Sequence, residues 1–388
     1  MNAQITTLID WPLPEGGDLL KYEIKVLSDP LPFDKIGNLF KETYIEPYYD
    51  TGGLAWSEKY AEWFLPAFYP DRTFFYSTWV GSELVATLLG NPVEIVVDNS
   101  VELKTICLSL ASTHQDHRNR GLQKNMIKQL IEKARGLGFD LVYGMPEKKK
   151  GGALLKNYFD FTCFQKKDKH RIKPMEDYGI KEFKEKRGMN PLLAKLAGIY
   201  AKIPQDKIER GVIRDGKMDD LASTVAIYNA YRKLLPLSIK LSKSRLEYEI
   251  KNYFNNIRQL GSHFHPEWKV WEEGNEILAS LLIRYEAALF KNGSIPVALF
   301  WNLGYKEGLS IDEKTAFLAE VLQYIRKTYP EVGVCQTTMA ANEIKVYDDL
   351  KFADDQVNYE LWALPLTAQG EEINRYPKYK EFFIMYHR

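Results

Sequence analysis

Residues 114–136 read HQDHRNRGLQKNMIKQLIEKARG, and this stretch decides the fold of the chain. The nearly apolar run KTICLSLAS at 104–112 precedes it and predicts a central strand. Apolar side chains at helical spacing then predict a helix over 122–137. The positions that carry this spacing are Met126, Leu130, Ile131 and Ala134. A central strand, a polar loop and a helix are therefore expected to follow one another directly.

Gly121 lies at the mouth of this helix, where a backbone without a Cβ atom can come close to a bound oxygen. A helix N-terminus offers unpaired N–H groups and a partial positive charge. Arg118 and Arg120 flank Asn119 just before the glycine, and a guanidinium can donate two hydrogen bonds to one phosphate. Two interpretations stand side by side: a cradle for a pyrophosphate, or an ordinary strand-to-helix connection with exposed arginines.

The length of 388 residues suits two domains of ordinary size. Lys plus Arg equals Asp plus Glu at 52 each, so the net charge gives no reason to expect a nucleic-acid partner. No apolar run approaches the roughly 20 residues of a membrane span. Residues 1–20 also lack the apolar centre of a signal peptide. We expect a cytoplasmic protein without a membrane span.

Cysteine and histidine give no strong signal for a disulfide or a metal. Cys107, Cys163 and Cys335 stand far apart in apolar surroundings, which favours buried reduced thiols over a catalytic cysteine. His263 and His265 have a spacing that suits a metal ligand pair on a strand. No third ligand follows them, so a surface turn is favoured and no metal is expected.

The order of elements in the first half predicts the fold class. Two β-rich runs at 74–80 and 84–97 enclose a short polar turn and predict a hairpin before the central strand. A strand, a short helix and a strand are expected after the long helix. The sequence therefore predicts an α/β (α+β) fold with a mixed, largely antiparallel twisted sheet flanked by helices. The aromatic-rich segment 41–70 is interpreted either as a pocket lining or as a helix stripe in the core.

After residue 208 the same order of helices, hairpin, strand, helix, strand, short helix and closing strand repeats. Two halves with one element order imply a duplicated fold. The segment before it is charged, lacks a sustained apolar face and is interpreted as an exposed connector. The expected divisions are a first domain at 1–165, a connector with an amphipathic helix at 166–207, and a second domain at 208–388.

The loop resembles the acyl-CoA-binding motif of the GCN5-related N-acetyltransferase (GNAT) superfamily. That pattern, Arg/Gln-x-x-Gly-x-Gly/Ala, follows a splayed central strand and opens a helix. It reads here Arg118-Asn119-Arg120-Gly121-Leu122-Gln123, and it departs from the family at Gln123, where Gly or Ala is usual. The run NYFDFTCF at 157–164 loosely resembles the closing Tyr and Phe motif of the superfamily.

A longer resemblance is to the protein N-myristoyltransferase branch, which has tandem halves with the motif only in the first. The segments YIEPYY at 44–49, FFYSTWVGSELVATLLGNPVEIVV at 74–97 and VYDDLKFADDQVNYELWAL at 346–364 occur in the same order. The resemblance covers about three hundred residues at low sequence identity. In that branch the second half holds the acceptor. The second half here lacks the glycine motif, so the resemblance implies an acceptor side that is degenerate for CoA.

The resemblance also implies roles for single residues. Backbone groups of Leu110 and Ala111 would face the thioester carbonyl as an oxyanion hole, and those of Ser112 and Thr113 would pair with the pantetheine arm. The pyrophosphate would lie against the loop and the first helical turn. The residues implied there are Arg118, whose side chain would brace the loop, and Asn119, Arg120, Gly121, Leu122 and Gln123. The implied co-substrate is acetyl-CoA or a longer acyl-CoA.

Two features of the branch do not carry over. Its glycine-rich stretch is replaced by KFADDQVNYE at 351–360, and the chain continues past the expected apolar tail to Arg388. Myristoylation of protein N-termini is therefore not expected, and a different amine acceptor, a small molecule or a peptide, is favoured. Tyr158 is the candidate general acid for the thiolate, with a tyrosine packed in the core as the alternative.

The predicted function is that of an acyl-CoA-dependent N-acyltransferase that works by direct attack of the amine. The acyl group transferred is most often acetyl. The alternative is a non-catalytic acyl-CoA-binding sensor or scaffold with the same fold. The sequence leaves acyl length, acceptor, general base and oligomeric state open.

Overall fold

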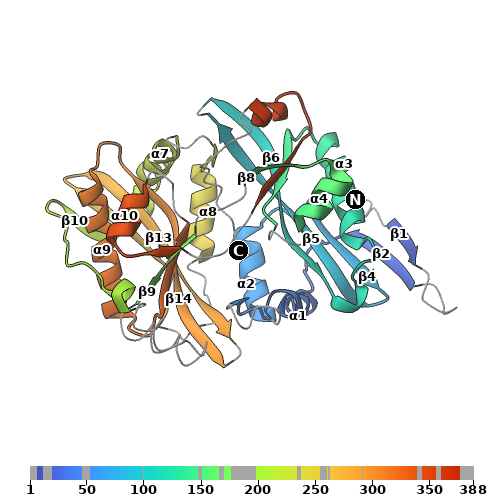
Figure 1. Cartoon of the computed structure of the whole chain (residues 1–388), viewed down its shortest axis with the longest axis horizontal. Coiled ribbons are helices and arrows are strands. Elements are labelled where there is room, and N and C mark those ends of the chain that lie inside the picture. The colour runs from blue at the N-terminus through green and yellow to red at the C-terminus, as the bar shows by residue number, and fades with distance from the viewer. Residues whose placement is uncertain are drawn as a thin grey trace.

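The computed structural model of the chain describes residues 7–11, 20–45, 53–98, 100–146, 151–165, 170–175, 198–233, 237–253, 260, 263–290, 292–338, 343–354 and 360–375. These residues form two halves side by side, each a mixed sheet flanked by helices (Figure 1). The predicted fold class, with its tandem arrangement, is confirmed. Each half is built around a long antiparallel hairpin followed by a parallel strand.

The first sheet has the order β1-β2-β4-β5-β6-β7-β17-β8, with β11 paired to β5. Its strands are β1 (Thr7–Trp11), β2 (Leu20–Val26), β4 (Phe75–Val80), β5 (Glu83–Val97), β6 (Val101–Thr113), β7 (Leu141–Gly144), β8 (Thr162–Gln165), β11 (Leu237–Ile239) and β17 (Leu361–Pro365). Apolar side chains of α3 (Leu122–Gly136) and α4 (Gly151–Phe159) cover one face. Those of α1 (Phe33–Tyr44) and α2 (Glu58–Phe68) pack on the other face.

The second sheet has the order β10-β12-β13-β14-β15-β9-β16, with β3 paired to β13. Its strands are β3 (Gly53–Leu54), β9 (His170–Pro174), β10 (Val212–Asp215), β12 (Glu267–Glu273), β13 (Glu276–Phe290), β14 (Gly293–Tyr305), β15 (Val334–Thr338) and β16 (Ala353–Asp354). Its α-helices are α7 (Leu221–Arg232), α8 (Lys243–Tyr253), α9 (Ile311–Thr328) and α10 (Ile344–Asp349). Short 3₁₀ turns lie at η2 (Gln115–His117), η3 (Met218–Asp220) and η5 (Gly370–Arg375).

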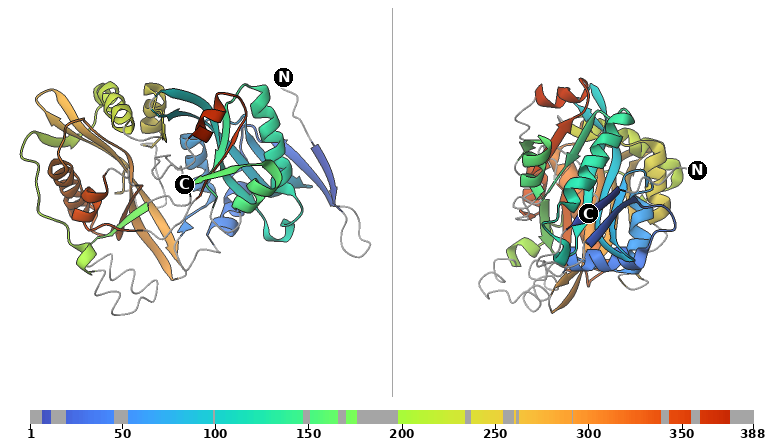
Figure 2. Two further views of the ribbon diagram at one scale, coloured as in Figure 1. Left: turned by 45° about the horizontal axis from the view of Figure 1, so that its top comes forward. Right: turned by 90° about the vertical axis from the view of Figure 1, so that its right-hand side faces the viewer.

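The two halves exchange strands. β17, late in the chain, is inserted between β7 and β8 of the first sheet, and β9 is inserted between β15 and β16 of the second (Figures 1 and 2). The interpretation of 166–207 as an exposed connector is therefore wrong for β9. The assignment of the closing strand to the second domain is wrong as well, because β17 belongs to the first sheet.

The charge of β9 misled the sequence interpretation, because its charged side chains have hydrogen-bond and ion-pair partners in distant parts of the folded chain. Lys173 is fully buried, and its ammonium donates to the carbonyls of Tyr200 (2.6 Å) and Lys202 (2.9 Å). Arg171 donates to the carbonyl of Phe352 and lies 3.3 Å from a carboxylate oxygen of Asp348. A buried charge is tolerated where such partners are present, and only the folded chain brings them together.

The duplication extends to a detail of the backbone. Leu110 in β6 and Asn302 in β14 both have a left-handed conformation, with φ of 47° and 48°. Each is the tenth residue of its strand. The ladder to the preceding strand shifts register at the matching place in both halves, between Thr87 and Leu89 and between Ser280 and Leu282. The same β-bulge is therefore present twice.

Each half also opens a sheet edge beside its bulge. β6 pairs with β7 only from Thr105 to Leu108, although its pairing with β5 continues to Thr113. In the second half β14 pairs with β15 only from Val297 to Phe300. Among the described residues, no strand therefore neighbours the backbone edge of β6 that follows Leu108 on its β7 side.

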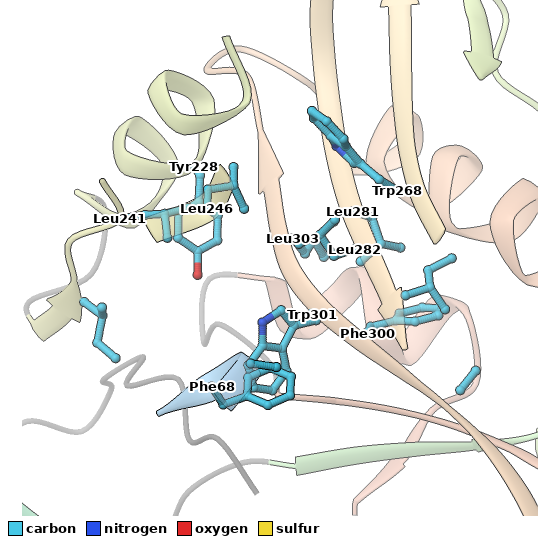
Figure 3. Packing of buried hydrophobic residues seen from close by; sticks show 14 of the residues in the cluster. Phe68, Tyr228, Leu241, Leu246, Trp268, Leu281, Leu282, Phe300, Trp301 and Leu303 are labelled. Atoms are coloured by element: carbon cyan, nitrogen blue, oxygen red, sulfur yellow. The ribbon is translucent and has the colours of Figure 1, made fainter. Parts of the chain in front are cut away.

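The aromatic side chains of α2 pack in the core where the halves meet. Phe68 lies against Trp301 of β14 with ring centroids 5.8 Å apart (Figure 3). Arg284 and Glu286 of β13 form a fully buried ion pair, and the Arg284 guanidinium also covers the Phe68 ring at 4.9 Å. Burial raises the pKa of Glu286. Of the two interpretations of 41–70, the core stripe holds for α2, whereas residues 46–52 lie outside the described residues.

Candidate functional site

The loop before α3 leaves a helix N-terminus open. Asn119 and Gly121 both have left-handed backbones, with φ of 62° and 71°. Gly121 is the N-cap of α3 and has no side chain to accept from the N–H groups of the first turn, which holds no acidic residue. Asn125 Nδ2 donates to the Gly121 carbonyl at 3.1 Å and leaves those N–H groups free of it. A Cβ atom at Gly121 would meet only the Asn125 amide nitrogen, at 3.8 Å, so the space before the helix is open. Such a concave run of N–H groups attracts anions.

The matching helix of the second half is closed by its own side chains. Ser310 caps α9 by accepting from the Glu313 N–H at 3.2 Å, and the Glu313 carboxylate accepts from the Ser310 N–H at 2.8 Å. Asp312 adds a second acid to the first turn. These acids repel a phosphate, and two of the N–H groups it would need are taken.

The open edge of β6 presents the backbone of alternate residues. The His114 N–H donates to Val85 of β5 at 2.9 Å, so the backbone groups of Ser112, two residues earlier, also face β5. Those of Ala111 and Thr113 face the open edge. There the Ala111 carbonyl accepts from the Tyr44 hydroxyl at 3.0 Å. The expectation that Ser112 pairs with a pantetheine arm is therefore wrong, because its backbone groups already face β5.

Arg118 lies across the start of the loop. Its Nε donates to the Thr113 carbonyl at 3.2 Å, which ties the loop to the end of β6. A guanidinium held in this way fixes the direction in which the chain leaves the strand. It also keeps a positive charge beside the open N-terminus of α3.

Gln123, which departs from the family motif, points into the sheet. Its Nε2 lies 3.0 Å from the Thr87 carbonyl, 2.7 Å from the Ser112 carbonyl and 3.0 Å from Thr113 Oγ1. The larger side chain therefore leaves the space before α3 free. Gln123 joins α3 to β5 and β6.

Thr87 is a site residue that the sequence interpretation missed. Its hydroxyl donates to the carbonyl of Leu110, the bulged residue, at 3.1 Å, and its side chain is fully buried. The available signal was a hydroxyl within the apolar run LVATLLG at 84–90. A buried hydroxyl in such a run requires a hydrogen-bond partner.

The Arg120 side chain is held against β2. Its guanidinium donates to the Tyr22 hydroxyl, which in turn lies 3.0 Å from Nδ1 of His117. Burial lowers the pKa of His117, and the Arg120 charge lowers it further. Arg120 therefore offers its backbone, rather than a free side chain, to the mouth of α3.

Tyr158 does not lie in the core. It is 56% exposed, and its ring covers the Lys124 ammonium at 4.1 Å, beside the first turn of α3. The alternative interpretation, a packed tyrosine, is wrong. Its hydroxyl is accessible on the helix that flanks the open N-terminus.

The thiols and the histidine pair do not build another site. Cys107 and Cys335 are free and buried, and burial raises the pKa of both thiols, that of Cys107 to about 12. His263 pairs with Glu331. Within the described ranges no group of three or more His, Cys, Asp or Glu side chains is arranged to hold a metal ion. The same ranges contain no helix long and apolar enough to cross a membrane.

Comparison with known proteins places this geometry in a family context. Residues 33–151 match the family model described as an acetyltransferase (GNAT) domain. The chain is similar in structure to Saccharomyces cerevisiae N-myristoyltransferase with bound myristoyl-CoA, with a TM-score of 0.70 and 13% identity over 92% of this chain and 81% of that one. A second structure of that complex has a TM-score of 0.70 and 12% identity, over 92% of this chain and 85% of that one. A comparison with curated protein sequences finds no significant match.

The matched region spans α1 to the start of α4 and thus contains the bulged strand, the open edge and the α3 N-terminus. The structural likeness extends over both halves. Residues 33–151 of this chain are therefore similar to a GNAT acetyltransferase domain, and the chain as a whole has the tandem fold of N-myristoyltransferase.

Proposed function

We propose that the protein is an acyl-CoA-dependent N-acyltransferase that binds the CoA thioester in its first half. The observation that carries the proposal is the uncapped N-terminus of α3 at Gly121, next to the open edge of β6. A pyrophosphate fits the helix N-terminus, and an extended arm with amide groups fits the strand edge. Acetyl-CoA and longer acyl-CoAs both meet this description.

The proposed roles are supported by the directions of the backbone groups at Ala111, Ser112 and Thr113. Ala111 and Thr113 face the open edge and would hold the pantetheine arm, whereas Ser112 faces β5 and holds that strand. The amides of Leu110 and Ala111 would polarise the thioester carbonyl as an oxyanion hole. The N–H groups at the mouth of α3 would bind the pyrophosphate. They belong to Asn119, Arg120, Gly121, Leu122 and Gln123, and Arg118 braces the loop.

In the proposed reaction the amine nitrogen attacks the thioester carbonyl carbon. The C–S bond then breaks, the amine proton passes to solvent, and the thiolate takes a proton from Tyr158. The acceptor would lie toward the second half, since acids and a capping box close the N-terminus of α9 to a phosphate. A small-molecule or peptide amine fits this reaction.

Thermal stabilisation by CoA thioesters from acetyl to palmitoyl tests the proposal. A ligand that binds only the folded state adds about 2.7 kcal/mol of stability at a hundredfold excess over its dissociation constant. We expect one chain length to raise the melting temperature most. The yeast N-myristoyltransferase binds myristoyl-CoA, which supports including long chains. If no thioester shifts the melting temperature, the proposal fails.

Release of free CoA separates an enzyme from a non-catalytic sensor. With the best-binding thioester and an added amine, an enzyme liberates thiol in proportion to the amide formed. A sensor or scaffold shows the thermal shift without any thiol release. A panel of small-molecule and peptide amines then identifies the acceptor.

Tyr158→Phe is expected to lower kcat by about a hundredfold and to leave KM for the thioester unchanged, because a general acid acts in the transition state. Steady-state kinetics with the identified amine measures both constants. Lys124→Met, which removes the cation from the Tyr158 ring, is the matched control and should retain most of the activity. An unchanged kcat for Tyr158→Phe would remove it from the mechanism.

A further inference from the structure

We propose that Thr87 and Gln123 are positioning residues that hold the left-handed backbone of Leu110 in the conformation that polarises the thioester carbonyl. This inference rests on the proposed function and deepens it. It concerns two side chains that the acyl-CoA motif does not include as ligands. Neither would touch the reacting atoms.

Leu110 needs support from outside its own backbone. A branched side chain with φ near 47° is strained by about 1–2 kcal/mol relative to the ordinary strand conformation. The Thr87 hydroxyl donates to its carbonyl at 3.1 Å across the register shift. Because Thr87 is fully buried, no water competes for this hydrogen bond. One hydroxyl therefore fixes the orientation of the peptide group between Leu110 and Ala111, whose N–H belongs to the proposed oxyanion hole.

Gln123 fixes the same bulge from the helix side. Its amide nitrogen is within 3.0 Å of the carbonyls of Thr87 and Ser112, and since carbonyls only accept, the nitrogen must be the atom that faces them. One side chain thus joins the first turn of α3 to both strands of the bulge. The position of the pyrophosphate cradle is thereby coupled to that of the thioester carbonyl.

The second half shows that the bulge itself does not require this arrangement. Asn302 keeps the same φ, but its side chain donates to Glu249 at 3.2 Å. Ser280, which matches Thr87, accepts from the Trp268 indole at 2.8 Å. The Thr87 and Gln123 contacts are therefore found in the half whose helix N-terminus is open, and a different set of contacts holds the bulge in the half whose helix is capped.

The test compares Thr87→Val, which keeps the shape and removes the hydroxyl, with Thr87→Ser, which keeps the hydroxyl. Gln123→Met and Gln123→Ala remove the amide, and Ser280→Ala is the matched control in the second half. Infrared difference spectra of the best-binding thioester, labelled with ¹³C at its carbonyl, report polarisation of the bound carbonyl. Transfer to hydroxylamine, followed by thiol release, reports the rate without the natural acceptor.

We expect Thr87→Val and Gln123→Met to move the carbonyl band back toward its position in free thioester. The rate should fall by about ten- to a hundredfold, less than for loss of an oxyanion donor itself. Thioester affinity should change little, because the cradle at Gly121 is intact. Thr87→Ser and Ser280→Ala should resemble the wild type. Gln123→Ala restores the usual small residue of the family, so a loss in this variant argues directly for the side chain.

Two results would overturn the inference. One is a wild-type carbonyl band and rate in both Thr87→Val and Gln123→Met. The other is an equal loss in Ser280→Ala, which would mean that any change at a bulge disturbs the fold. If Thr87→Val does not fold, Gln123→Met decides the question. Failure of the wild type to bind any thioester would instead refute the proposed function, and that outcome is distinct from both.

Discussion

Gly121→Asp is expected to abolish acyl-CoA binding, with affinity falling at least about a hundredfold. The carboxylate would stand at the mouth of α3, where the pyrophosphate is proposed to bind, and would repel its charge at short range. The glycine has a φ of 71°, a conformation that Asp and Asn tolerate better than other side chains. The variant therefore tests charge at the cradle more than backbone strain.

Gly121→Asn is the matched control, since it has nearly the same shape without the charge. We expect it to weaken binding only moderately. Asp and Asn cap a helix about equally well, and the negative charge of Asp is also favourable at a helix N-terminus. The unliganded Gly121→Asp protein should thus melt no lower than Gly121→Asn. Calorimetric titration with the best thioester measures affinity, and equal binding by the two variants would contradict the cradle.

Separating the halves is expected to prevent either from folding alone. A fragment of residues 1–207 lacks β17, which pairs with β7 and β8 on its two edges, and a fragment of 208–388 lacks β9. Each would expose unpaired strand edges and apolar surface. We expect each fragment by itself to be insoluble or molten, and the two expressed together to form a 1:1 complex. Co-purification and circular dichroism measure this result.

β9 could fill the place of β17 in the isolated first fragment, but its side chains do not fit that place. Trp362 of β17 packs so closely on Gly152 that a Cβ atom there would lie 2.9 Å from the indole nitrogen. β9 offers HRIKP, with no aromatic ring of that size. In the reassembled complex Trp362→Ala should cost about 3–5 kcal/mol. Cooperative, native-like melting of the isolated 1–207 fragment would contradict this prediction.

The loop at 114–121 was predictable because its signals are local. A central apolar strand, a glycine at a helix mouth and two arginines lie within about twenty residues, and periodicity alone places the helix after them. Because the same order of local patterns occurs in both halves of the sequence, the duplication could be predicted as well. The closed N-terminus of α9 is equally local, since Ser310 and Glu313 form a capping box three residues apart.

The contacts that shape the bulge were not predictable in this way. Thr87 and Leu110 are 23 residues apart, and nothing in the order of elements predicts a left-handed leucine in a strand. Gln123 was interpreted as a departure from a ligand motif, because a motif does not say where a side chain points. In the structure it points into the sheet.

The sequence by itself predicted the long hairpins, the central strand at 104–112, the helix that begins after Gly121 and the repeated order of the elements. Side-chain periodicity and backbone preference act over a few residues, so they can be recognised in the sequence. The tertiary structure alone decided that β9 and β17 change places between the sheets and that Thr87 meets Leu110. The pattern of a strand shows that its backbone edges must pair with other strands. Which strands those are depends on packing among segments far apart in the sequence.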